Sequence, residues 1–155
     1  MNKFIKWGLI LLACGVVLGV SAYTIIMFTP HRDVQATPTD FKISAKTLVH
    51  ETLDDAIASN AKYLEEDGNS KIIEVTGTVA AVNEDMNKQK TILLKEEGEG
   101  AGVNCTFTLN TNAKVEEVHV GDKVTIKGLF KSGAEFDEDM EEYLDVNLSK
   151  CDIIK

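Results

Sequence analysis

The stretch KIIEVTGTVAAV, residues 71–82, decides the fold that we expect for this chain. Its residues alternate between apolar and polar around Gly77, which is typical of a strand with one buried face. A similar stretch, KVTIKGLF, returns at residues 123–130 with Gly128 in the matching place. Because a strand that closes a small barrel must bend sharply, a residue without a Cβ atom suits both positions. The residues of the first strand that we expect to face the core are Ile73, Val75, Val79 and Ala81.

Three more stretches alternate in the same way and predict three more strands, at residues 90–95, 103–109 and 144–153. In the last of them Cys151 has the opposite parity to the apolar residues before it, which predicts a β-bulge near residues 149–150. Together the five strands favour a mainly β fold, namely a five-stranded OB-type Greek-key barrel.

An amphipathic α-helix is expected before the barrel. Ser44 is a suitable N-cap, and apolar residues then recur every three or four positions over residues 44–64. A short helical turn is expected over residues 113–120, between the third and fourth strands. Residues 30–43 contain both prolines of the chain and no periodic pattern, so we interpret them as a linker. The soluble domain is therefore expected to comprise residues 44–155.

The N-terminal segment, residues 1–29, is expected to be a transmembrane signal anchor. Residues 7–28 are 22 consecutive residues without a charge. A helix of this length, which rises about 1.5 Å per residue, spans the roughly 30 Å hydrocarbon core of a bilayer. Lys3 and Lys6 precede it, so the positive-inside rule places the N-terminus in the cytoplasm and the rest of the chain outside.

Two alternatives to an uncleaved anchor share this basic start. Residues 20–22, Val-Ser-Ala, could form a signal-peptide cleavage site, although cleavage there would leave an apolar N-terminus. Residues 11–14, LLAC, resemble a lipobox in which Cys14 would be lipidated, although the apolar run continues well beyond it. We expect the uncleaved anchor because of its length. All three possibilities place the soluble domain outside the cytoplasm. The uncleaved anchor predicts a single-pass protein of the bacterial cell membrane with a periplasmic or extracellular soluble domain.

Charge is distributed very unevenly along the chain. All 25 Asp and Glu residues lie after residue 30, where they face 14 basic residues and give a net charge of −11. Phosphate backbones are usually bound by clustered Lys and Arg, so this balance disfavours a nucleic-acid partner.

Four stretches carry a resemblance to a known family: IIEVTGTVAAV, VNCTFTL, VGDKVTIKGLF and LDVNLSKCDII. With them, residues 44–155 resemble the bacterial tRNA-anti-like family of OB-fold proteins, which is named for its likeness to the anticodon-binding OB domain of tRNA synthetases. The resemblance implies the OB fold, and the family name suggests a nucleic-acid ligand. It brings no established catalytic or binding residues.

The soluble region contains one pair of cysteines. In an OB barrel the last strand lies beside the third, so Cys105 and Cys151 are expected to be neighbours on adjacent strands. Outside the cytoplasm such a pair can form a disulfide, and we predict one here. In a reducing compartment the same residues would be two buried thiols.

Motifs for catalysis are absent from the sequence. There is no recognisable nucleophile and base, CxxC, HExxH, P-loop or dinucleotide-binding glycine motif, so we expect neither an enzyme nor a bound cofactor. Asp137, Asp139 and Glu141 alternate as in a calcium-binding loop, but the glycine and the distant glutamate of an EF-hand are missing. They form a weak candidate for a calcium site, and a simple charged loop is the alternative.

The OB barrel has a generic binding face on its second and third strands. The outward residues expected there are Lys90, Lys95, Asn104, Thr106 and Thr108, which include none of the aromatic side chains that stack on bases. We therefore predict a non-catalytic binding module for an envelope protein or an oligosaccharide. The alternative is an OB protein that binds single-stranded or tRNA-like nucleic acid.

Overall fold

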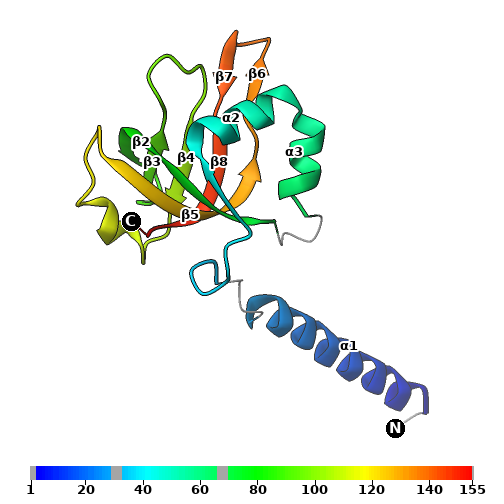
Figure 1. The fold of residues 1–155 in the computed structure, drawn as a ribbon. Helices are drawn as coiled ribbons and strands as arrows, with labels where there is room; N and C mark the ends of the chain where they lie inside the picture. The colour runs from blue at the N-terminus through cyan, green and yellow to red at the C-terminus, as the bar shows by residue number, and fades with distance from the viewer. Residues whose placement is uncertain (1–2, 29–32, 66–69, 155) are drawn as a thin grey trace. The chain divides into compact units, whose positions relative to one another are not determined.

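The computed structural model describes residues 3–28, 33–65 and 70–154, and it forms two compact units, Met1–Arg32 and Asp33–Lys155 (Figure 1). In the first unit α1 (Lys3–Phe28) is one continuous helix. The hydroxyls of Ser21 and Thr24 donate to carbonyls one turn earlier in this helix. A helix is therefore present where the sequence predicts a transmembrane segment. Within the described residues, however, no helix is both long and apolar enough for a membrane crossing.

The second unit is built on a closed five-stranded barrel. Its strands are β2 (Ile72–Glu84), β3 (Lys90–Leu94), β4 (Val103–Phe107), β5 (Lys123–Ser132) and β8 (Val146–Ile153). They follow one another in the order β2-β3-β4-β8-β5, and β5 pairs back onto β2 to close the barrel (Figure 1). Only the β4–β8 pair is parallel among these. The mainly β, five-stranded OB-type barrel predicted from the sequence is confirmed.

The two glycines that repeat in the sequence lie on the inner side of the seam between β2 and β5. A Cβ atom at Gly77 would lie 2.8 Å from Cβ of Ala45, and one at Gly128 would lie 2.7 Å from Sγ of Cys151. Both distances are shorter than the van der Waals contact between two carbon atoms or between carbon and sulfur. The glycines therefore leave room for a helix and a strand to pack closely against the seam.

Strand β2 also contains a β-bulge beyond Gly77. The register with β3 shifts between Val79 and Ala81, so Ala81 lies opposite Leu93 and Val82 lies opposite Ile92. Val82 packs against the core in consequence, and the prediction that Ala81 faces inward is wrong. The extra residue at the bulge reverses which of the following side chains point into the barrel and which point out.

The bulge predicted in the last strand is confirmed. Leu129 pairs with Ser149 and Lys127 with Asp152, so β8 contains one more residue than β5 over this interval. Lys150 takes the left-handed conformation there, with φ of 52°. Cys151 is thereby returned to the core, where it is completely buried.

The helix before the barrel is broken into α2 (Ala45–Asp54) and α3 (Ala56–Tyr63). Ser44 caps α2 as predicted, because its hydroxyl accepts a hydrogen bond from the Thr47 amide. At Asp55 the backbone leaves the helical region, and the Asp55 carboxylate accepts from the Ala58 amide to cap α3. A single helix over residues 44–64 is therefore wrong, because Asp55 ends one helix and starts the next.

Glu51 holds α2 and α3 together. Its carboxylate accepts hydrogen bonds from Nζ of Lys62 and from the hydroxyl of Tyr63. The Lys62 hydrogen bond keeps the pKa of Glu51 below its ordinary value, and burial raises the pKa of Tyr63. The Tyr63 ring is completely buried, 5.0 Å from the ring of Phe130 on β5. The helix pair is therefore joined to the barrel core.

The segment before α2 packs against the outside of the seam. β1 (Phe41–Ser44) pairs in parallel with β2, and Val34 is buried with Ile72 and Leu129. Nζ of Lys127 donates to the carbonyls of Gln35 and Thr37. Although the sequence predicts a linker over residues 30–43, its described part is in contact with the barrel.

Two short elements complete the second unit. α4 (Asn112–Val115) supplies the helical turn expected between β4 and β5, with Val115 buried. β6 (Glu135–Asp137) and β7 (Glu142–Leu144) form an antiparallel hairpin where the sequence predicts an acidic loop. In Figure 1 this hairpin rises next to α2 at one end of the barrel.

Cys105 and Cys151 are free thiols, so the predicted disulfide is not present. The two strands are neighbours as predicted: Cys151 lies opposite Phe107 and Cys105 opposite Leu148, and the two thiols interact by a hydrogen bond. Both side chains are fully buried, and burial raises the pKa of the Cys151 thiol well above its ordinary value. They fill the core as small apolar groups.

We expect Gly77→Ala to destabilise the domain by about 1–3 kcal/mol, because the added methyl overlaps Cβ of Ala45 and Cβ of Leu94, 3.2 Å away. Combining it with Ala45→Gly removes the shorter overlap, so the double variant should be more stable than the sum of the two single changes predicts. Thermal unfolding of the four proteins measures this coupling. Simple additivity would show that the two positions do not touch.

Candidate functional site

The generic binding face is only partly formed by the predicted residues. Asn104, Thr106 and Thr108 alternate with the buried Val103, Cys105 and Phe107 of β4, so their side chains lie on the outside. Thr106 lies opposite Thr91 of β3, and Asn104 opposite Leu93. Lys95 follows β3 with the same outward parity. Lys90 has the parity of the buried Ile92 and Leu94, so it does not belong to this face.

Both lysines of this set have partners inside the protein. Nζ of Lys90 lies 3.0 Å from a carboxylate oxygen of Glu116, and Nζ of Lys95 donates to the carbonyl of Gly100. The amide of Asn104 donates to Oδ1 of Asn147 on β8. The face therefore presents mainly hydroxyls and amides, and its one lysine, Lys95, is hydrogen-bonded to the Gly100 carbonyl.

Half of the twelve described lysines in the second unit form ion pairs. These six lie within 4 Å of a carboxylate: Lys42 with Glu74, Lys46 with Glu99, Lys62 with Glu51, Lys71 with Glu65, Lys90 with Glu116, and Lys114 with Asp152. In each pair the carboxylate compensates the lysine charge, which disfavours contact with a phosphate backbone at that place.

The hairpin carries an exposed pair of aromatic rings, which the sequence analysis missed. Phe136 on β6 lies opposite Tyr143 on β7, and the two ring centres are 4.9 Å apart. Phe136 is 49% exposed and Tyr143 is 47% exposed, and Met140 in the turn is 57% exposed. Large apolar side chains gathered on one exposed element are typical of an interaction surface.

The hairpin is fixed at its base by three contacts. Oδ1 of Asp145 accepts a hydrogen bond of 2.7 Å from the buried amide of Gly102. The amide of Ala134 donates to Oγ1 of Thr52 on α2. The ring of Tyr143 lies directly over Gly100, where a Cβ atom would be 2.6 Å from the ring. The hairpin is thus held between α2 and the loop over residues 95–102.

That loop is itself tied to α2 through Glu99. One oxygen of the Glu99 carboxylate lies 2.9 Å from Nζ of Lys46, and the other lies 2.9 Å from Nε2 of His50. The Lys46 hydrogen bond lowers the pKa of Glu99. Helix α2 therefore supports both sides of the hairpin base.

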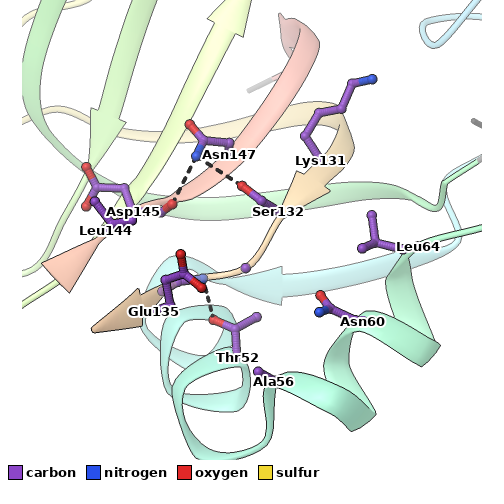
Figure 2. A pocket seen from close by; sticks show the side chains of 12 residues that line it. Thr52, Ala56, Asn60, Leu64, Lys131, Ser132, Glu135, Leu144, Asp145 and Asn147 are labelled. Carbon is purple, nitrogen blue, oxygen red and sulfur yellow. Dashed lines mark hydrogen bonds between the residues drawn. The ribbon is translucent and has the colours of Figure 1, made fainter. Parts of the chain in front are cut away.

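A small pocket of about 190 Å³ lies at the hairpin base (Figure 2). One wall is formed by Thr52, Ala56, Asn60 and Leu64 of the helices, and the rest by residues 131–135, Leu144, Asp145 and Asn147. Figure 2 shows the Asn147 amide donating to Oγ of Ser132 and to the carbonyl of Asp145. Because Asn147 also accepts from Asn104, the polar lining continues onto the outer face of β4.

The acidic residues of the hairpin are not arranged as a metal site. Within the described residues, no group of three or more His, Cys, Asp or Glu side chains could hold a metal ion. Oδ1 of Asp137 accepts hydrogen bonds from the amides of Asp139 and Met140, and so it stabilises the turn. Glu141 takes a left-handed conformation in the same turn, with φ of 54°. The alternation of Asp137, Asp139 and Glu141 therefore reflects the turn of a hairpin.

The closed barrel with its covering helices defines an OB-fold protein. More particularly, the chain belongs to the tRNA_anti-like family, whose model matches residues 1–139. The match begins at the first residue, so it includes the N-terminal segment that lies outside the range expected from the sequence. It ends before β8.

Solved structures are similar to this chain at low sequence identity. A protein of Klebsiella pneumoniae subsp. pneumoniae, described provisionally as a nucleic acid-binding lipoprotein, is 14% identical with a TM-score of 0.53, covering 77% of this chain and 100% of that one. The OBody NL8, bound to hen egg-white lysozyme, is 20% identical with a TM-score of 0.38, covering 55% and 96%. The Stn1–Ten1 complex of S. pombe is 14% identical with a TM-score of 0.37, covering 54% and 58%. The last two likenesses are too weak to support an inference. No curated protein matches the sequence.

Removing the Asp145 carboxylate should weaken the attachment of the hairpin base to Gly102. We expect Asp145→Ala to cost about 1–3 kcal/mol, because the Gly102 amide is buried and would lose its charged acceptor. Asp145→Asn keeps an acceptor oxygen and should cost less than half as much. Thermal unfolding of the three proteins measures both values. Equal losses for the two variants would show that the hydrogen bond to Gly102 is not what Asp145 contributes.

Proposed function

We propose that this protein is a non-catalytic binding module, held at the bacterial cell membrane by its N-terminal segment with the barrel outside the cytoplasm. We further propose that it binds its partner through the β6–β7 hairpin. The observation that carries this proposal is the exposed pair formed by Phe136 and Tyr143 on an element that is fixed at its base. Exposed aromatic anchors on a rigid support are typical of binding surfaces.

Attachment to the membrane is supported by the N-terminal sequence. Residues 7–28 contain no charge, and Lys3 and Lys6 precede them, as in segments that insert with a cytoplasmic N-terminus. The family match includes this segment. The Klebsiella pneumoniae protein with the same fold is described as a lipoprotein. Cys14, in LLAC, offers a residue for such a modification if the anchor is of that kind.

The proposal of binding without catalysis rests on the side chains that the barrel presents. The face of β3 and β4 offers threonines and asparagines, and its lysine ends in a hydrogen bond to the Gly100 carbonyl. These groups can hydrogen-bond a partner, but they include no paired nucleophile and base. The hairpin adds the exposed rings of Phe136 and Tyr143.

Nucleic acid is the second candidate, because the family name and the description of the Klebsiella pneumoniae protein both point to it. The charges of this chain oppose it. Six lysines are paired with carboxylates, and the part beyond residue 30 carries a net charge of −11. A single strand would need to displace these six carboxylates to reach the lysines that they pair with.

Site-specific photo-crosslinking in living cells tests this proposal. A photo-reactive phenylalanine analogue replaces Phe136 in the full chain, and the membrane fraction is analysed after illumination. We expect discrete crosslinked species that are insensitive to nuclease. The matched control places the same analogue at Met86, which is fully exposed on the turn between β2 and β3, and should give none.

Three outcomes would contradict the proposal. Crosslinks of equal yield from positions 136 and 86 would remove the hairpin as the binding surface. Crosslinks that disappear on nuclease treatment would establish the nucleic-acid alternative. Recovery of the chain in the soluble fraction would disprove membrane attachment.

A further inference from the structure

The open side of the β6–β7 hairpin leads to a more specific inference, which rests on the proposed function. We propose that its aromatic face binds a polypeptide segment rich in arginine and lysine. The partner is defined by three features of this chain: an unpartnered face of a two-stranded sheet, the uncompensated negative charge around it, and the length over which that charge extends.

The aromatic face is open on one side and supported on the other. Phe136 and Tyr143 form the middle cross-strand pair of the hairpin, so their rings share one face. The Tyr143 ring rests on Gly100, which prevents it from moving further toward the barrel. Each of the two residues is about half exposed to solvent. A planar guanidinium or an ammonium group can stack on such rings, because the ring faces carry partial negative charge.

The charge around this face is negative and unpaired. Six of the eight residues from 135 to 142 are Asp or Glu. Six carboxylates elsewhere in the second unit are paired with lysines, but none of the six hairpin carboxylates lies within ion-pair distance of a basic side chain in the described part of the chain. The exposed Glu96 and Glu97, in the loop that supports Tyr143, are also without an ion pair there. A cationic partner would therefore complement the hairpin.

The arrangement of the carboxylates favours an extended cation over a small one. They are distributed along both strands and the turn, and Asp137 already accepts two backbone hydrogen bonds. No group of them converges on one point. A strand of three residues extends about 10 Å, which matches several successive residues of an extended peptide. Arginine is favoured over lysine because its planar group both stacks on the rings and pairs with carboxylates.

Fluorescence anisotropy tests the inference with the full chain in micelles of an uncharged detergent. The probe is a fluorescein-labelled deca-arginine peptide, and labelled deca-glutamate is the negative control. We expect deca-arginine to bind and deca-glutamate not to bind. Phe136→Leu and Tyr143→Leu keep apolar bulk but remove the ring faces, so each should weaken binding by about 2- to 5-fold, the effect of one cation–π contact at an exposed site.

A charge-matched pair of variants separates the hairpin from the general acidity of the domain. Glu138→Gln with Glu142→Gln removes two hairpin charges, and Glu84→Gln with Glu117→Gln removes two exposed charges elsewhere. The first pair should weaken deca-arginine binding several-fold more than the second. Thermal unfolding verifies that all variants remain folded.

Equal weakening by the two pairs, or no binding of deca-arginine at low salt, would overturn the inference. The proposed function has a separate readout, because crosslinking from position 136 does not depend on the probe. Crosslinks without deca-arginine binding would therefore disprove only the basic partner. The loss of both results would disprove the hairpin as a binding surface.

Discussion

The close contact between α2 and the β2–β5 seam is the constraint on which the rest of this structure depends. Gly77 allows Ala45 to approach the seam more closely than any side chain there would permit. With α2 seated at this depth, Thr52 reaches the chain after β5 and accepts a hydrogen bond from the Ala134 amide. The same helix holds the loop beneath Tyr143 through Lys46, His50 and Glu99. A contact inside the barrel thus determines where the hairpin stands on its surface.

The distribution of charge follows from this architecture and determines what the surface can bind. Six lysines pair with carboxylates, including Lys90 on β3 with Glu116, which follows α4. The excess negative charge remains where no lysine is within reach, and the hairpin between β5 and β8 is the densest such place in sequence. The two exposed rings lie in the middle of it. An OB barrel that meets nucleic acid would need the reverse arrangement.

Much of the barrel could be predicted because alternation along a strand is a local property of the sequence. Parity alone located the bulge before Cys151, since only an extra residue could return it to the core. The same reasoning failed at Ala81, because the small apolar residues at positions 80–82 are compatible with either face. It was misapplied to Lys90 and Lys95, which have opposite parity. The break at Asp55 is made by a side-chain cap, which helical periodicity does not reveal.

The binding surface was harder to predict than the fold. The stretch EFDEDMEEYL, residues 135–144, contains the short alternation of a hairpin, with Phe136 and Tyr143 symmetrically placed about the turn. Its many acidic residues suggested a solvated loop, because charge is depleted in strands and common in loops. The disulfide prediction placed the two cysteines correctly on adjacent strands, and their thiols interact in the core, but both thiols are free. The most direct test of the account is amide hydrogen exchange at Ala134. The Phe130 amide, which donates a hydrogen bond to the Lys71 carbonyl, serves as the internal reference. The account predicts that Ala134 is protected in the native protein and that Thr52→Val accelerates its exchange while Phe130 remains protected. Unprotected exchange of Ala134 in the native protein would contradict it, because α2 would then not hold the hairpin.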